Sequence, residues 1–175
     1  MEQSNSLLLN ETALQLRPES EKALFVLEWL RHLNKILHVV NRSDIKSSQK
    51  KLQEQLLRQM HSSPGPPIRY YLAKCLASLF AVGDSVGLFE IINTCNDLIK
   101  QKDDPATLNN RLAALEVLGE MYEKLGRMVG RSYDETFFAC SKTLKSAESQ
   151  LRMEIMRTLE KVVRGMGSAA AHLHK

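Results

Sequence analysis

The side chains best suited to catalysis or metal binding are scattered widely along this sequence of 175 residues. The histidines are His32, His38, His61, His172 and His174, and the cysteines are Cys75, Cys95 and Cys140. None of their spacings matches an HExxH motif, a zinc finger or a paired metal knuckle. We therefore predict structural or surface histidines. The cysteines fall at apolar helical positions and are odd in number, which indicates small buried hydrophobes rather than disulfides.

Two further features resemble parts of catalytic sites but have simpler explanations. Asp103 and Asp104 come just before Pro105 at an expected helix start, where a negative charge interacts favourably with the helix dipole. Gly83 and Gly87 flank a turn and do not form a glycine-rich phosphate loop. The sequence thus predicts no catalytic residue, no metal ligand and no cofactor site, and the protein is not expected to be an enzyme.

The composition is that of an ordinary globular domain. Hydrophobic residues make up 43% and charged residues 25%, which argues against a disordered or collagen-like chain. The net charge of +4 is spread evenly, so nucleic acid is not an expected partner. Neither a membrane span nor a basic segment before Leu7–Leu9 is visible, so we expect no signal peptide and a cytoplasmic location.

Apolar residues recur at the helical spacing i, i+3, i+4 and i+7, whereas the alternation typical of strands is almost absent. The sequence therefore predicts an all-α fold in a single unit. Its expected parts are a short N-terminal helix or cap (1–17), a first helix pair (18–60), a Pro-rich linker (61–67), a second pair (68–100), a third pair (105–146) and the start of a fourth pair with a frayed tail (147–175). We expect Ser132 and Glu135 to form a capping box and the last helix to end near Arg164.

A repeat of about forty residues relates these helices to one another. A shift of 42 positions, and then of 41, aligns Arg69, Leu76, Leu79 and Phe80 with Arg111, Leu118, Met121 and Tyr122, and then with Arg152, Leu159, Val162 and Val163. An earlier shift of 46 aligns Val26, Leu30 and Leu33 less completely. Such a period predicts an α-solenoid of HEAT-like antiparallel helix pairs, an α-α superhelix. The alternative is a compact helix bundle whose periodicity is accidental.

Basic residues also recur along the last expected helix. They are Arg152, Arg157, Lys161 and Arg164, and the acidic residues between them are Glu154 and Glu160. Opposite charges three and four positions apart stabilise an exposed helical surface. We therefore predict a solvated helix face here and no site for phosphate or acidic lipid.

Several short blocks are typical of one particular family. They are SLLLNE (6–11), EWLR (28–31), KKL (50–52), SSPGPP (62–67), LAK (72–74), CND (95–97), YEKLGRM (122–128) and LKSAESQ (144–150). Through these blocks, most of the chain resembles the N-terminal segment of the HEAT repeat-containing protein 5 family. Members of that family are far longer, so this chain resembles an N-terminal segment or a short isoform.

The resemblance implies a non-enzymatic scaffold that acts with aftiphilin and gamma-synergin as an accessory to the Golgi and endosomal clathrin adaptor. The implied process is membrane traffic between endosomes and the trans-Golgi network. The implied location is cytoplasmic, peripheral to endosomes, Golgi and endocytic vesicles. The alternative from another class is a compact all-α regulatory or adaptor bundle that binds a partner helix and is unrelated to vesicle traffic.

The last expected helix carries apolar residues that a following helix would cover in a longer stack. They are Ile155, Met156, Leu159, Val162 and Val163. Because solenoids need polar ends to stay dispersed, we predict that these five residues form a stacking surface. Self-association or partner docking would take place there.

Overall fold

The computed structural model describes residues 7–173, and every regular element within them is helical. The elements are α1 (Glu11–Leu16), α2 (Glu19–Ile36), α3 (Arg42–Met60), α4 (Pro66–Val82), α5 (Leu88–Ile99), the 3-10 helix η2 (Pro105–Thr107), α6 (Leu108–Leu125), the 3-10 helix η3 (Gly126–Ser132), α7 (Tyr133–Leu144) and α8 (Ser149–Leu173). No strand occurs in these residues, so the predicted all-α class is confirmed. None of the described helices is both long and apolar enough to cross a bilayer.

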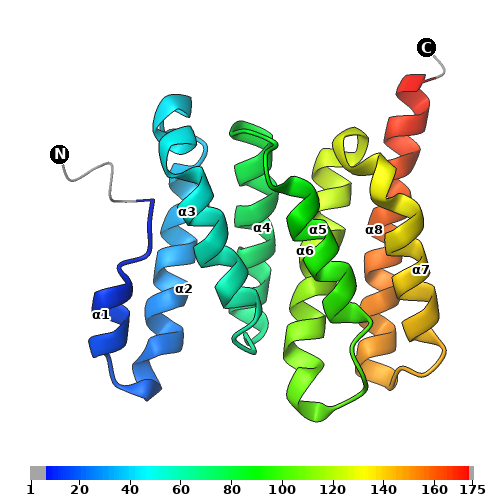
Figure 1. Cartoon of the computed structure of the whole chain (residues 1–175), viewed down its shortest axis with the longest axis horizontal. Coiled ribbons are helices and arrows are strands. Elements are labelled where there is room, and N and C mark those ends of the chain that lie inside the picture. The colour runs from blue at the N-terminus through cyan, green and yellow to red at the C-terminus, as the bar shows by residue number, and fades with distance from the viewer. Residues whose placement is uncertain (1–6, 174–175) are drawn as a thin grey trace.

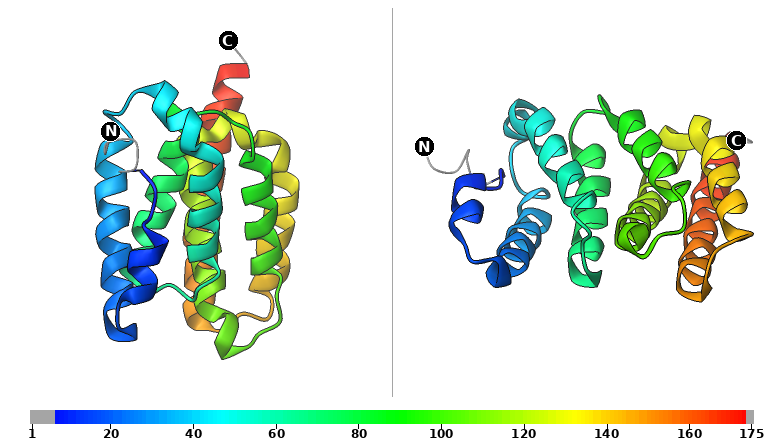
Figure 2. Two further views of the ribbon diagram at one scale, coloured as in Figure 1. Left: turned by 60° about the vertical axis from the view of Figure 1, so that its left-hand side comes forward. Right: turned by 60° about the horizontal axis from the view of Figure 1, so that its bottom comes forward.

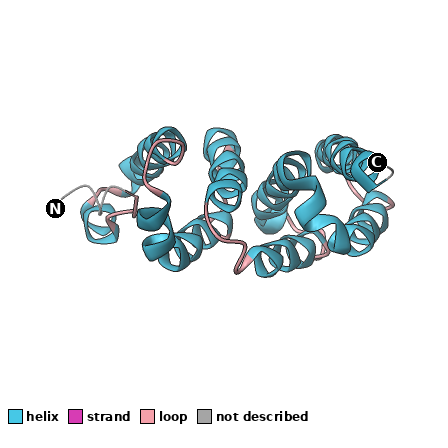
Figure 3. Cartoon of the chain, turned by 90° about the horizontal axis from the view of Figure 1, so that it is seen from above, coloured by secondary structure: helices cyan, strands magenta, loops and turns pink. Residues whose placement is uncertain are grey.

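The helices lie in two layers, seen end-on in Figure 3. In the first layer α2, α4, α6 and α8 lie side by side and run in the same direction, whereas α3, α5 and α7 run the opposite way in the second layer (Figure 1). The most extensive contacts join α4 to α6 and α6 to α8. Helices α1 and α8 therefore lie at opposite ends of the row, as the right-hand view in Figure 2 also shows.

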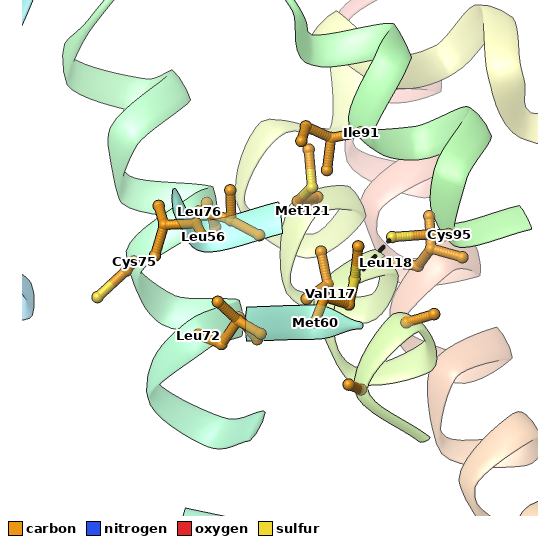
Figure 4. Packing of buried hydrophobic residues seen from close by; sticks show 14 of the residues in the cluster. Leu56, Met60, Leu72, Cys75, Leu76, Ile91, Cys95, Val117, Leu118 and Met121 are labelled. Carbon is orange, nitrogen blue, oxygen red and sulfur yellow. Dashed lines mark hydrogen bonds between the residues drawn. The ribbon is translucent and has the colours of Figure 1, made fainter. Parts of the chain in front are cut away.

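The hydrophobic core extends across helices of both layers. Leu56 and Met60 of α3 enter the same buried cluster as Leu72 of α4 and Met121 of α6 (Figure 4). The sulfur atom of Met60 also lies 3.6 Å from the Sγ atom of Cys95 in α5. Because burial of apolar surface is the main stabilising term, the helices that share this cluster stabilise one another.

The residues before α2 cover the N-terminal end of the row. Leu7 and Leu9 are buried, and the indole nitrogen of Trp29 donates a hydrogen bond to the carbonyl oxygen of Leu7 at 3.0 Å. The side-chain amide of Gln55 in α3 binds both the N–H and the carbonyl of Leu9, at 2.9 and 3.0 Å. The segment that contains Leu7 and Leu9 therefore covers this end of the first layer.

Two helix boundaries differ from the expectation for local reasons. Helix α4 begins at Pro66 because proline is well suited to the first turn, where its missing N–H is not needed. Ser132 does not cap α7, so the predicted capping box is wrong. The backbone of Ser132 is already helical at the end of η3, whereas a capping residue needs an extended backbone.

Helix α8 continues past Arg164 to Leu173, so the predicted frayed tail is wrong as far as residue 173. Residues 174–175 lie outside the described part of the chain. Gly165 lies inside α8, where its lack of a side chain lets the backbone of α6 approach closely. A Cβ atom there would collide with the carbonyl oxygen of Tyr122, and a Cβ atom at Gly126 would lie 2.7 Å from the carbonyl oxygen of Gly165. The end of α6 and the middle of α8 therefore touch backbone to backbone.

Candidate partner-binding surface

The residues capable of redox, metal or acid–base chemistry stay apart in the folded chain. Nowhere in residues 7–167 do three or more His, Cys, Asp or Glu side chains gather as metal ligands would. Burial raises the pKa of Cys75 and of Cys140 to about 12, so both thiols are protonated and unreactive near neutral pH. Cys95 is also buried and unpaired. The histidines His32, His38 and His61 are exposed, and the side chains of His172 and His174 lie outside the described residues.

The two adjacent aspartates have separate structural roles. Asp104 accepts a hydrogen bond from the backbone N–H of Ala106 at 2.9 Å, so its predicted capping role is confirmed. Asp103 instead binds the guanidinium of Arg111, with 2.6 Å between Oδ1 and Nη1. The capping prediction is wrong for Asp103, because a buried arginine needs a negative partner more than an exposed helix start does.

The recurring arginines hold the backbone that leads into their helices. Arg69 and Arg152 each donate to the carbonyl oxygen five residues earlier, at 2.9 and 3.3 Å. Arg111 donates from Nε and Nη2 to the carbonyl oxygen of Ile99, at 3.3 and 3.1 Å. The loop before α6 is longer, so the accepting carbonyl comes from the end of α5. The repeated arginine therefore makes the same kind of bond in α4, α6 and α8.

A row of charged side chains crosses the first layer, and we call it the charge ladder. It consists of Arg69 and Lys74 on α4, Glu116, Glu120 and Glu123 on α6, and Arg157, Lys161 and Arg164 on α8. The carboxylate of Glu120 binds the ammonium groups of Lys74 and Lys161, at 3.1 and 2.8 Å. Arg164 lies 3.3 Å from Glu123. The sign of the charge thus alternates from α4 to α6 to α8.

The ladder carboxylates differ in how well the fold stabilises their charge. Burial alone would raise the pKa of Glu120, but hydrogen bonds from Lys161 and Lys74 outweigh burial and lower that pKa. Burial, and then the nearby charge of Glu154, raise the pKa of Glu116, although Arg69 and Lys161 oppose them. The fold therefore stabilises the charged form of Glu120. It destabilises the charged form of Glu116.

The basic side of α8 is only partly a solvated face, so the prediction made for it is incomplete. Arg157 and Arg164 do pair along α8 with Glu154 and Glu160. Lys161, however, reaches across to α6, as does Arg164. These cross-helix pairs join residues 41 positions apart, which is the repeat spacing, so that spacing was the signal that could have revealed them.

A groove of about 450 Å³ lies among α4, α6 and α8, beside the ladder. Its lining includes Tyr70, which is half exposed, and Thr158, whose hydroxyl donates to the carbonyl oxygen of Leu115 at 2.9 Å. Gly119 lets Lys161 lie close to α6, because a Cβ atom there would be 3.0 Å from the Lys161 Cδ atom. Aromatic and arginine side chains are enriched in protein interfaces, so this groove is suited to a protein partner.

The predicted stacking surface on α8 separates into two sides. Ile155 and Val162 are fully buried, so they do not belong to an open surface and the prediction is wrong for them. Neighbouring residues of a helix point in directions about 100° apart, and sequence spacing alone did not show which direction the fold covers. Met156 and Val163 remain exposed at 55% and 53%, beside the half-buried Leu159. We call these three residues the outer face of α8, and they line an open groove of about 600 Å³.

The chain is distantly similar to a known plant protein. The chain is 23% identical over 126 residues to Protein SWEETIE of Arabidopsis thaliana. The match covers 71% of this chain but 6% of that protein, so the chain spans a small part of its relative's length. No family model matches the chain. No solved structure matches it either.

Proposed function

We propose that this chain is a segment of an α-solenoid of HEAT-like helix pairs and that it serves as a non-enzymatic scaffold for protein partners. The observation that carries the proposal is the equivalence of Arg69, Arg111 and Arg152. Each lies near the start of a first-layer helix and donates to the backbone before that helix. Accidental periodicity would align apolar positions but would not reproduce the same polar contact in successive pairs.

The proposed partners rest on the sequence resemblance to the HEAT repeat-containing protein 5 family. They are aftiphilin, gamma-synergin and, through them, the clathrin adaptor of the trans-Golgi network and endosomes. The proposed role is in traffic between those compartments, at a cytoplasmic location peripheral to endosomes, Golgi and endocytic vesicles. The groove beside the charge ladder supports a partner-binding role, because it combines an exposed aromatic side chain with charges of both signs.

Small-angle scattering tests the architecture. A compact chain of this length has a radius of gyration of about 16 Å, and an elongated row of helix pairs exceeds that value. A radius clearly above it, unchanged on dilution, supports the solenoid. A value at the compact limit favours the alternative of an all-α bundle that binds one partner helix.

A pull-down from cytosol tests the trafficking role. The whole chain is the bait, and immunoblots for aftiphilin, gamma-synergin and the adaptor are the measurement. A matched bait with Tyr70→Ala and Arg157→Glu changes two exposed residues of the groove and should keep its fold. Recovery of these partners by the unchanged bait and reduced recovery by the variant support the proposal. Absence of all of them from both baits would refute the trafficking role.

A further inference from the structure

A small basic cavity of about 190 Å³ lies where α5 and α7 end, at the bottom of the second layer in Figure 1. We call it the lysine cavity, because its lining includes Lys100, Lys102 and Lys142. Lys142 lies 42 positions after Lys100, so the repeat brings equivalent lysines of neighbouring helices to one place. Both helices lie inside the row, and further pairs stacked beyond α7 and α8 would leave the cavity open.

The positive charges of the lysine cavity are poorly neutralised by the rest of the fold. Among the described residues, neither Lys102 nor Lys142 forms an ion pair. Lys100 makes a long contact of 3.8 Å with Asp97, whose side chain is 79% exposed. Exposed pairs of this kind contribute little, so all three ammonium groups can bind an incoming anion.

The negative groups at the inner side of the cavity are already bound by other residues. The carboxylate of Asp103 lies in the lining and binds the buried guanidinium of Arg111, with 2.6 Å between Oδ1 and Nη1. The carbonyl oxygen of Ile99, at the end of α5, accepts from Arg111 at 3.1 Å and from the Thr143 hydroxyl at 3.2 Å. Free carbonyls at a helix end repel an anion, and these bonds reduce that repulsion.

The surface next to the lysine cavity limits what kind of anion can approach. A second cavity of about 310 Å³ shares Asp103 and Arg111 with it, and its lining includes Asp104 and Glu148. An anionic membrane presents a wide negative surface, which these carboxylates would repel. A single phosphate group on a short protein segment would meet the lysines without that repulsion.

The size and charge of the lysine cavity match one phosphate group. Its volume equals that of about six water molecules in the liquid, which is too small for a typical cofactor. A phosphorylated side chain has a charge of about −1.5 to −2 at neutral pH and three acceptor oxygens, so it can bind several lysines at once. A carboxylate has a smaller charge and only two oxygens.

We propose that the lysine cavity binds the phosphate group of a phosphoserine or phosphothreonine in a partner protein. The phosphate would accept charge-assisted hydrogen bonds from the ammonium groups of Lys102 and Lys142, with Lys100 beside them. The exposed hydroxyl of Ser146, which also lines the cavity, can donate a further bond. This inference rests on the proposed scaffold function and adds that phosphorylation of the partner controls its binding at this surface.

An NMR titration of the full 175-residue chain tests the site, because it detects weak binding. The probe is a short alanine–glycine peptide with one central phosphoserine, and two matched peptides carry glutamate or unmodified serine instead. The backbone amide signal of Ser146 reports binding. One double variant, Lys102→Ala with Lys142→Ala, removes two charges from the cavity. Its matched control, Lys50→Ala with Lys51→Ala, removes two charges from an exposed part of α3.

The phosphoserine peptide is expected to shift the Ser146 signal and to bind about tenfold more tightly than the glutamate peptide, whereas the serine peptide should not bind. The cavity variant should bind the phosphoserine peptide about tenfold more weakly, because two charge-assisted bonds are lost. The α3 variant should retain its affinity, since salt screens distant charges. Thermal melts check that both variants fold. Equal affinity for the phosphoserine and glutamate peptides, no shift at Ser146, or equal weakening by both variants overturns the proposal.

Vesicles distinguish a lipid phosphate from a protein phosphate. They consist of phosphatidylcholine with a phosphatidylinositol phosphate, and sedimentation with the vesicles measures binding. We expect the chain to remain in the supernatant, because carboxylates line the neighbouring cavity. Sedimentation that requires Lys102 and Lys142, without binding of the phosphoserine peptide, would overturn the proposal in favour of a membrane surface.

The outcomes separate this inference from the trafficking role. If the phosphoserine peptide binds as expected but the pull-down recovers no adaptor accessory, the phosphate site stands and the trafficking role fails. If the peptide does not bind and the cavity variant recovers the accessories as well as the unchanged chain does, the scaffold role stands and this inference fails.

Discussion

Glu120→Gln removes the charge that joins three first-layer helices while preserving the shape of the side chain. The carboxylate binds Lys74 of α4 and Lys161 of α8, and its own side chain is only 11% exposed. The two lysine side chains are 36% and 34% exposed. The variant therefore leaves two cations close together in a partly buried groove without the anion between them.

The size of the effect follows from the number and burial of these contacts. A hydrogen bond to a charged group contributes about 1.5–3 kcal/mol, whereas an exposed ion pair contributes well under about 1 kcal/mol. Because solvent screens both lysines, we take about 1 kcal/mol for each contact. Glu120→Gln should then lower the free energy of unfolding by about 2 kcal/mol, which corresponds to a fall in Tm of roughly 4–8 °C for a chain of this size.

The effect should depend on pH with a defined sign. The pKa of Glu120 is lowered in the folded state, so its contribution is present above the unfolded value of 4.5 and is lost as the pH falls through the folded value. Burial alone would lower the pKa of Lys161, but the bond to Glu120 raises it, so that contribution is lost only as the pH rises above 10.5. The difference in the free energy of unfolding between the variant and the unchanged chain should have its full size between these two pH values. It should shrink below pH 4.5.

Glu116→Gln is the matched control one helical turn away. Burial and Glu154 raise the pKa of Glu116, and its contact with Arg69 is long, at 3.9 Å. Removing this charge should therefore leave stability unchanged or raise it by a few tenths of a kcal/mol. Urea and thermal unfolding followed by circular dichroism, at neutral pH and in acid, provide the measurement. Equal losses in the two variants, or a loss at Glu120 that persists undiminished in acid, would refute the reasoning.

Three further predictions use the same unfolding assays and one labelling assay. Gly165→Ala should cost about 1–3 kcal/mol because its Cβ atom meets the carbonyl oxygen of Tyr122, whereas Gly167→Ala, with nothing within 4 Å, should stabilise the helix by up to about 1 kcal/mol. Asn96→Leu should raise Tm, because both amide atoms of Asn96 are buried without a hydrogen-bond partner among the described residues; a clear fall in Tm contradicts this. The three cysteines should resist a thiol reagent at mildly alkaline pH until the chain unfolds, since burial raises the pKa of each. Rapid labelling of the native chain would show that the helices open far more readily than their packing indicates.

The helical class and the recurrence of arginine and apolar positions could be read from the sequence alone. Both depend on spacing along one helix, where the 3.6-residue turn determines which side chains share a face. The same reasoning placed Asp104 as a cap and Cys75 in the core, because capping and burial of a small apolar side chain need little information about distant segments.

Only the tertiary structure decided which side of each helix meets a neighbour. Ile155 and Met156 are adjacent and both apolar, yet one is buried and the other exposed, because α6 covers one side of α8. Gly165 has the sequence features of a helix end, but it lies inside α8 because the backbone of α6 comes too close for any side chain. The bonds from Glu120 to Lys74 and Lys161 likewise join residues more than 40 positions apart. Such contacts depend on the crossing and separation of whole helices, which are set by the packing of the complete core and not by any local pattern.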